Sequence, residues 1–171
     1  MEAARLATEA DVPRLAELAR QAIGELVPMR GGAVWWAQEG RQEPVEDGFL
    51  ADLRDPGRRV LAGTIDDTVV AYAVARVDLL ADGSRLGVVE DIYVEPGARQ
   101  VGLGEAMMDH LVAWCTEQGC FGMDAVALPG HRSTKNFFEE SGFTARKLVM
   151  HHSLQADGAA GPDATGAESA P

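Results

Sequence analysis

The most regular hydrophobic pattern in the chain lies between residues 103 and 115. Apolar side chains recur there at steps of three and four residues, at Leu103, Met107, Met108, Leu111, Val112 and Cys115. This spacing is that of one face of an α-helix. Glu105, Asp109 and His110 take the other face. The pattern predicts an amphipathic helix with one face in the core, and residues 86–94 before it predict a strand.

A second helical stripe lies near the N-terminus, where apolar residues at 15, 18, 19, 22, 23 and 26 share one face. Asp11 is a capping residue and Pro13 is tolerated in a first turn. Residues 5–7 before them predict a short strand. The glycine-rich stretch 28–44 is interpreted as a loop or a short helix, and residues 45–53 predict a further helix that stops near Asp55-Pro56-Gly57.

The remaining elements are mostly strands. Residues 59–65 and 69–77 predict a hairpin joined by the polar turn at 66–68, and the turn at 82–84 leads into strand 86–94. After the central helix we expect a strand at 122–128, a helix at 131–141 ended by Gly142, and a last strand at 144–154. This order predicts a mixed α/β domain over residues 1–154. Residues 155–171 are small, polar and low in complexity, which predicts a disordered tail.

Length and composition restrict the class of protein. With 171 residues and 46% hydrophobic content, we expect one domain with a full core. No apolar run approaches the roughly 18 residues that span a bilayer, and the N-terminal residues lack the order of a signal peptide, so we expect a cytoplasmic chain. Cys115 and Cys120 are expected to be free thiols. No His or Cys spacing suits zinc, so no metal is expected.

The formal net charge of −12 restricts the partners. Nucleic acids and anionic membranes would require a basic patch, which argues against both. Three acids in residues 155–171 leave −9 for the body of the chain. A cationic small molecule or a basic peptide fits this charge better.

The segment 99–104 joins the predicted strand to the central helix through two glycines, Gly102 and Gly104. Such a junction directs free backbone N–H groups and the positive end of the helix dipole to one point, which favours phosphate binding. A Walker A loop is excluded because Glu105 and Ala106 follow Gly104. A GxGxxG fingerprint fails at Met107. The alternative is a tight turn without a ligand.

The segment resembles the pyrophosphate loop of the GNAT superfamily of N-acetyltransferases, whose pattern is Arg/Gln-x-x-Gly-x-Gly/Ala after a strand that ends in Val. Arg99, Gly102 and Gly104 match it, and Val94 closes the strand. Residues 4–11 resemble the family's opening R-x-A-T-x-x-D, and residues 136–143 its closing L-Y-E-x-x-G-F. The resemblance covers about residues 4–154. It implies a mixed α+β, three-layer fold with a central, mostly antiparallel sheet flanked by helices.

The resemblance also implies acetyl-CoA as cosubstrate. The implied pyrophosphate contacts are Arg99, Gln100, Val101, Gly102, Leu103, Gly104 and Glu105. The pantetheine arm would pair with backbone groups of Ile92, Tyr93 and Val94, where the strand separates from its neighbour. His131, Thr134 and Phe138, two helical turns along one face, are the further cofactor contacts.

Acetyl transfer to an amine requires a base, since free amines are mostly protonated at pH 7. Glu90 and Asp91 lie on the strand that leads to the cofactor loop, where several family members carry acids. Alternation predicts that their side chains point to opposite faces. We favour Glu90 as base, with Asp91 second. The alternative is that either carboxylate only pairs with an arginine.

The family's usual proton donor to the thiolate, a tyrosine, corresponds to Phe138, which cannot donate a proton. Tyr93, His131 or water would have to supply it, and a hydrogen bond from His131 to the cofactor is the simpler role for that residue. The leading hypothesis is an N-acetyltransferase of a primary amine. The alternatives are an acetyltransferase of protein amines and a non-catalytic acetyl-CoA-binding module.

The acceptor and the assembly are the last expectations. Glu90, Asp91 and the aromatic pair Trp35 and Trp36 suggest a cationic small-molecule amine held by carboxylates and rings, although paired tryptophans most often only pack. The predicted last strand includes residues 147–152, which are long enough to pair with a second subunit. We therefore expect a homodimer.

Overall fold

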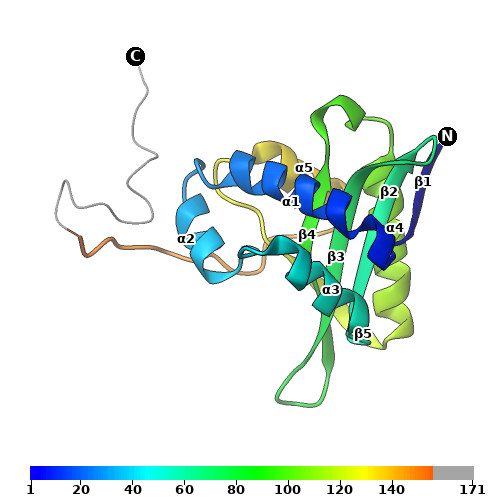
Figure 1. The fold of residues 1–171 in the computed structure, drawn as a ribbon. Coiled ribbons are helices and arrows are strands. Elements are labelled where there is room, and N and C mark those ends of the chain that lie inside the picture. Colours follow the sequence, from blue (N-terminus) through cyan, green and yellow to red (C-terminus); the bar gives the residue numbers. More distant parts are fainter. Residues whose placement is uncertain (156–171) are drawn as a thin grey trace. The chain divides into compact units, whose positions relative to one another are not determined.

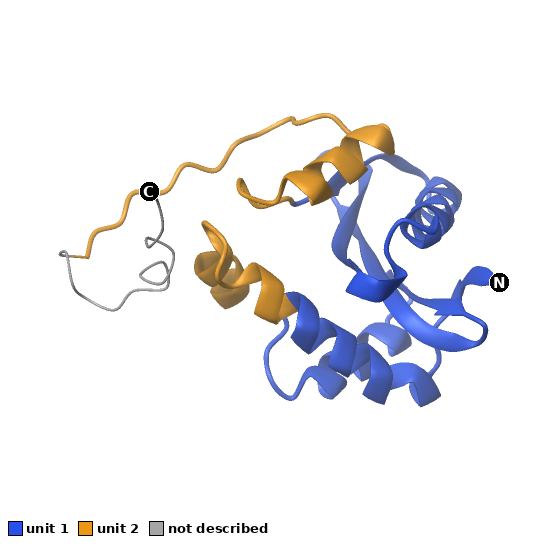
Figure 2. Ribbon diagram, turned by 90° about the horizontal axis from the view of Figure 1, so that it is seen from above, with its two compact units in different colours: residues 1–22, 41–126 blue, residues 23–40, 127–171 orange. Residues whose placement is uncertain are grey.

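The structure is a computed structural model that describes residues 1–155. These residues form two compact units, coloured separately in Figure 2. Unit 1 comprises residues 1–22 and 41–126, and unit 2 comprises residues 23–40 and the chain from 127 onward. Apart from Gln155, the predicted disordered tail lies outside the described residues.

Unit 1 is built on a five-stranded sheet in the order β1-β2-β3-β4-β5 (Figure 1). The strands are β1 Glu2–Leu6, β2 Arg58–Ile65, β3 Thr68–Leu79, β4 Arg85–Val94 and β5 Cys120–Ala125. The first four are antiparallel in succession, and β5 runs parallel to β4. The predicted mixed, mostly antiparallel sheet flanked by helices is therefore confirmed.

The helices follow the predicted order with one addition. In unit 1 they are α1 Val12–Leu26, which continues into unit 2, α3 Val45–Arg54 and α4 Leu103–Glu117. Two short 3₁₀ turns, Glu9–Asp11 and Pro96–Ala98, precede α1 and α4. Unit 2 contains α2 Gly32–Gln38 and α5 Arg132–Glu140. The stretch 28–44 thus forms a short helix rather than only a loop.

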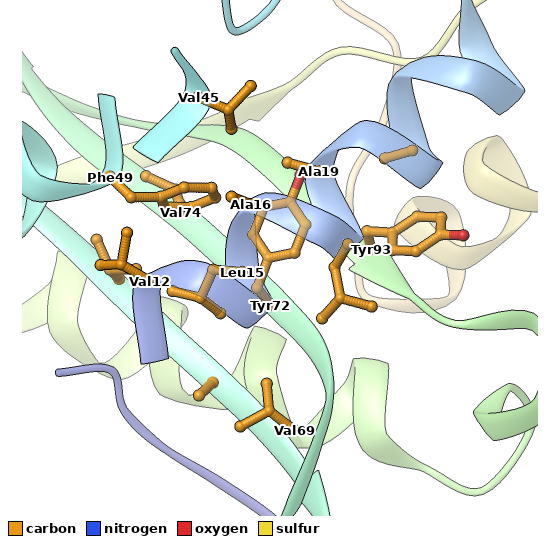
Figure 3. Packing of buried hydrophobic residues seen from close by; sticks show 14 residues of the cluster. Val12, Leu15, Ala16, Ala19, Val45, Phe49, Val69, Tyr72, Val74 and Tyr93 are labelled. Atoms are coloured by element: carbon orange, nitrogen blue, oxygen red, sulfur yellow. The ribbon is translucent and has the colours of Figure 1, made fainter. Parts of the chain in front are cut away.

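Alternation along β2 and β3 gives the sheet two apolar faces. Val60, Ala62, Tyr72 and Val74 belong to one buried cluster with α1 and α3, in which Tyr72 meets the Phe49 ring edge-on at 5.4 Å (Figure 3). The cluster includes Leu15, Leu18 and Ala19 of α1 and Val45 of α3. Asp91 also lies on this face, where it pairs with Arg41, which stacks on the Phe49 ring.

The opposite face of the sheet is covered by α4 (Figures 1 and 2). Small residues allow the helix to approach closely. A Cβ atom added to Gly63 would lie 3.1 Å from Leu103, and one added to Gly87 would lie 2.6 Å from the Cys115 sulfur. Ala71, Ala73 and Ala75 of β3 are fully buried. Both glycines are therefore required for packing, because a larger side chain would push the helix away.

Two predictions about the elements are wrong. Residues 144–154 form no strand in the described chain, and Leu148, Val149 and Met150 are each at least 85% exposed. An extended segment needs a neighbouring strand to complete its hydrogen bonds, and this one has none among the described residues. On α4, Val112 is 41% exposed, whereas Trp114 is buried. Trp114 takes the inner position because it fills the space beside β2.

Candidate active site

A β-bulge in β4 determines where the two predicted acids point. Val74 of β3 pairs with Asp91 and Ala75 pairs with Val89, so Glu90 is the extra residue between them. An extra residue interrupts the alternation of side chains along a strand. As a result Glu90 and Asp91 both project toward the α3 side of the sheet. The prediction that they point to opposite faces is wrong for this reason.

Three arginines bind this acidic pair. Arg41 Nε donates to Asp91 Oδ2 at 2.7 Å, and another nitrogen of Arg41 lies 2.8 Å from Asp52 Oδ2. Glu90 accepts from Arg58 and, at 2.7 Å, from Arg76 Nη1. These contacts link α3, β2, β3 and β4 into one network.

The network contains more acid than base. Arg58 also lies 3.4 Å from both Asp52 and Asp55, and Arg76 donates to Asp78. Five carboxylates therefore share three guanidinium groups, and the group is negative. The Arg41 guanidinium also stacks over the Phe49 ring at 4.0 Å, which fixes it against the core.

Asp91 lies in a poorly solvated part of the network, beside Arg41 and Asp52, and its side chain is 18% exposed. Burial raises the pKa of Asp91 above its ordinary value, and the charge and hydrogen bond of Arg41 partly offset this effect. A carboxylate with a raised pKa binds a proton more readily than a surface aspartate does. Asp91 is therefore suited to accept a proton, whereas both oxygens of Glu90 are already occupied by arginines.

β4 and β5 separate next to these acids. Their parallel pairing ends at Val89 with Ala125, while β4 continues to Val94. Ile92, Tyr93 and Val94 consequently have no register partner in β5. This is the separation that the resemblance implied for the pantetheine arm, and the role of these backbone groups remains a prediction.

The glycine loop that follows has the geometry of an anion site. Gly102, at the N-cap of α4, has a φ of +83°, and open space surrounds its Cα. The first N–H groups of a helix have no acceptors within it, and no side chain caps α4 here. Gln100 also adopts a positive φ of 68°. Arg99 Nε donates to the Val94 carbonyl oxygen at 2.8 Å, which ties the loop to the end of β4.

Tyr93 lies at this junction but is 8% exposed. Its ring is 6.5 Å from that of Tyr72, and the Arg99 guanidinium lies 5.4 Å from its centroid. Its hydroxyl donates to Gln21 Oε1 at the long distance of 3.5 Å, and Figure 3 shows its place beside α1. Tyr93 is thus held by the core close to the loop.

The other predicted cofactor contacts belong to unit 2. His131 is the N-cap of α5, and its Nδ1 lies 2.8 Å from the Thr134 hydroxyl oxygen. Phe138 is 7% exposed and packs between Phe137 and Phe143, with ring centroids at 5.6 and 5.5 Å. Trp35 and Trp36 are half-buried on α2. The structure brings His131 and Thr134 together and gives Phe138 an aromatic packing role.

Sequence reasoning allowed for an arginine beside either carboxylate, but it identified neither the three arginines nor Asp52. Arg41 comes from a loop and Asp52 from a helix that was assigned no chemistry. The one available signal was the acidic pair itself, because two adjacent half-buried carboxylates need nearby cations.

Comparison with known proteins identifies the family. A sequence model of the Acetyltransferase (GNAT) family matches residues 27–143. The chain therefore belongs to the GNAT acetyltransferase family. A search of curated proteins finds no match. No helix within residues 1–155 is long and apolar enough to cross a membrane.

Solved structures with the same fold include several acetyltransferases. The aminoglycoside N-acetyltransferase AAC(6')-Iy, in complex with CoA, is 17% identical, with a TM-score of 0.71 over 91% of this chain and 96% of that one. The aminoglycoside acetyltransferase meta-AAC0020, from an uncultured soil metagenomic sample and in complex with sisomicin, is 15% identical, with a TM-score of 0.67 over 91% and 97%. A tetramutant of the BH1408 protein from Bacillus halodurans is 18% identical, with a TM-score of 0.73 over 88% and 99%.

Proposed function

We propose that this protein transfers the acetyl group of acetyl-CoA to the amine of a cationic small molecule. One observation carries the proposal: the bulge in β4 turns Glu90 and Asp91 to the same face, beside the point where β4 leaves β5. The negative network around them is complementary to an ammonium group. The CoA bound to AAC(6')-Iy and the sisomicin bound to meta-AAC0020 support the same pair of substrates.

We infer that acetyl-CoA is held by the residues that the family resemblance implied. The N–H groups at the start of α4 would hold its pyrophosphate, and the β4 backbone at residues 92–94 would hold its pantetheine arm. The open space around Gly102 suits the close approach of a phosphate oxygen to the backbone. In the reaction, acetyl-CoA supplies a thioester carbonyl for the amine to attack.

Asp91 is our candidate base, and Glu90, the first choice from sequence, becomes the alternative. The Asp91 carboxylate takes a proton from the substrate ammonium, directly or through water. The free amine then attacks the thioester carbonyl carbon. As the C–N bond forms and the C–S bond breaks, the nitrogen releases its second proton to water. CoA leaves as a thiolate, which takes a proton from Tyr93 or water. Arg41 holds the Asp91 carboxylate in place throughout.

Release of CoA thiol from acetyl-CoA over a panel of amines tests the proposal. The panel contains polyamines, aminoglycosides, lysine-containing peptides and uncharged amines. Faster release with cationic small molecules than with peptides supports the assigned acceptor class, and a preference for peptides supports the alternative of protein amines. A preference for uncharged amines would contradict the role of the acidic network.

A binding module without turnover remains the second candidate function. It is favoured by one observation, the packing of Phe138 among aromatic rings where the family carries a tyrosine donor. Acetyl-CoA binding by calorimetry, together with no thiol release on any amine, would identify the chain as such a module.

A further inference from the structure

The chain has a second concave site on the α4 side of the sheet. It is a pocket of about 410 Å³ between α4 and the start of β2, lined by Leu6, Arg59, Asp109, His110, Ala113, Trp114 and Glu117. Arg58 and Arg59 are neighbours on β2, so alternation sends their side chains to opposite faces. Arg58 joins the acidic network, whereas Arg59 lies against α4. The pocket is therefore separate from the candidate active site.

Arg59 supplies the positive charge of this pocket, and one of its nitrogens lacks a hydrogen-bond acceptor. Its guanidinium lies 5.2 Å from the centre of the Trp114 ring. Its Nε is buried and has no hydrogen-bond acceptor among the described residues. None of the ion pairs in the described chain involves Arg59, although this chain is rich in acids. A ligand cannot reach the buried Nε, but Arg59 as a whole is half-buried and lines the pocket. The terminal nitrogens of a guanidinium without an ion pair match a planar carboxylate from a ligand, which is their preferred partner.

Two carboxylates lie along the helical wall of the pocket. Asp109, Ala113 and Glu117 follow one another at intervals of four residues, so they share one line on the exposed side of α4. Eight residues of helix place the two acids about 12 Å apart along the axis. Neither acid takes part in an ion pair within the described residues. Ala113 between them leaves room for an aliphatic chain.

These groups together specify the charge pattern of a ligand. Arg59 requires an anion, and Asp109 and Glu117 each favour a cation. A diamine would leave Arg59 without an acceptor, and a simple carboxylic acid would leave both aspartate and glutamate unmatched. An amino acid with a basic side chain carries one carboxylate and two cations, and its length fits between the two acids.

We propose that the α4 pocket binds an α-amino acid with a basic side chain. The amino acid's carboxylate meets Arg59, its two ammonium groups face Asp109 and Glu117, and its methylene chain lies along Ala113. The site is distinct from the acceptor site, so binding requires neither acetyl-CoA nor Asp91.

Calorimetric titration of the full chain with L-lysine tests this proposal. We expect saturable binding of one molecule per chain without acetyl-CoA. L-norleucine, which lacks the side-chain ammonium, and 1,5-diaminopentane, which lacks the carboxylate, should each bind at least about tenfold more weakly, the loss of roughly one charged contact. Equal binding of all three compounds, or no binding of L-lysine, would overturn the proposal.

Substitutions of the pocket acids test whether L-lysine binds in the pocket or elsewhere on the chain. Asp109→Asn with Glu117→Gln should weaken L-lysine binding by at least about tenfold. Asp47→Asn with Asp67→Asn changes the net charge equally at exposed positions elsewhere and should have no effect. Asp91→Asn should also leave binding unchanged. If Asp91→Asn abolishes binding and the pocket variant does not, L-lysine occupies the acceptor site and the pocket proposal fails, while the proposed function stands.

Discussion

Glu90 and Asp91 are consecutive residues, yet their side chains leave β4 on the same side of the sheet. The bulge that pairs Val74 with Asp91 and Ala75 with Val89 produces this arrangement. The bulge also places the two carboxylates in different surroundings. Glu90 is shared by two arginines, whereas Asp91 meets Arg41 in a less solvated position. Two chemically similar carboxylates thus differ in the arginines that hold them, and burial raises the pKa of Asp91.

The first prediction concerns the base. Asp91→Asn should lower kcat/KM at neutral pH by about 100-fold or more, because a general base contributes on that order. Raising the pH should recover part of the rate, since the amine then loses its proton without help. The measurement is the pH profile of thiol release with the best amine of the panel.

Glu90→Gln is the matched comparison, because it removes a carboxylate one residue away from the same network. We expect a smaller loss of rate than in Asp91→Asn. A larger loss in Glu90→Gln, with recovery at high pH, would return the role of base to Glu90. Circular dichroism of both variants checks that the sheet is intact.

A second prediction concerns Arg41. Its positive charge lowers the pKa of Asp91, so Arg41→Gln should raise that pKa. Since the base must be ionised to act, the acidic limb of the kcat/KM profile should move to higher pH. The variant should also lose about 3 kcal/mol of stability, because two poorly solvated carboxylates lose their partner.

Arg54→Gln is the control for Arg41, since Arg54 forms an exposed ion pair with Glu9. Arg54→Gln should leave the pH profile unchanged. It should alter the free energy of unfolding by no more than a few tenths of a kcal/mol. An unshifted acidic limb in a folded Arg41→Gln protein would show that Asp91 is not the group that titrates.

The third prediction tests the phosphate loop. Gly102→Val places a branched side chain at a φ of +83° and in the space left open for the ligand. The Kd for acetyl-CoA should rise by at least about tenfold, because close backbone approach is lost. Replacing Gly104 as well should enlarge the effect. Gly97→Ala is the control, because no atom lies within 4 Å of the added Cβ and the φ of Gly97 is not positive. This variant should bind acetyl-CoA with the parent Kd. Unchanged calorimetric affinity in folded Gly102→Val would refute the site.

The fourth prediction concerns acid stability. Asp11 accepts two hydrogen bonds from Arg5 at 2.8 Å and one from the Thr8 backbone N–H, and the contacts from Arg5 above all lower its pKa to about 2. A carboxyl with a depressed pKa stabilises the fold above its unfolded pKa near 4 and loses this contribution as pH falls toward 2. Asp11→Asn should therefore unfold about 1 kcal/mol more easily at pH 7. At pH 2 the difference from the parent chain should shrink, as chemical denaturation at both pH values can determine.

The fifth prediction concerns assembly. Residues 144–154 expose Leu148, Val149 and Met150. Their sequence includes Arg146 and Lys147 but no Asp or Glu, in a chain of net charge −12. We still propose a homodimer in which this segment pairs with a second copy. Sedimentation at micromolar concentration should show a dimer, and Leu148→Lys with Met150→Lys should give monomers. A monomeric parent chain would contradict the proposal.

Much of the fold was predictable because its determinants are local. The stripes on α1 and α4 and the hairpin turn, in which Asp66 and Asp67 adopt positive φ, are visible in the order of residues. The last strand was not predictable on this basis. Its apolar residues resemble a strand, but a strand depends on a neighbour that the sequence of the segment does not specify.

The site was predictable only in part for a similar reason. Gly102 and Arg99 lie in one short motif, so their spacing identifies them. Asp91 and Arg41 are 50 residues apart and meet because of a one-residue bulge. Nothing local in 88–92 marks that bulge, and without it alternation assigns Glu90 and Asp91 to opposite faces.

The close packing of α4 on Gly87 has a consequence for the two thiols. Cys115 is 1% exposed, and burial raises its pKa to about 12, so its sulfur remains a protonated thiol that reagents cannot reach. Cys120 is partly exposed at the start of β5. Alkylation should therefore modify Cys120 quickly and Cys115 only when α4 lifts from the sheet. The alkylation rate of Cys115 therefore reports how often α4 separates from the sheet, and the rate of Cys120 in the same sample serves as the internal reference.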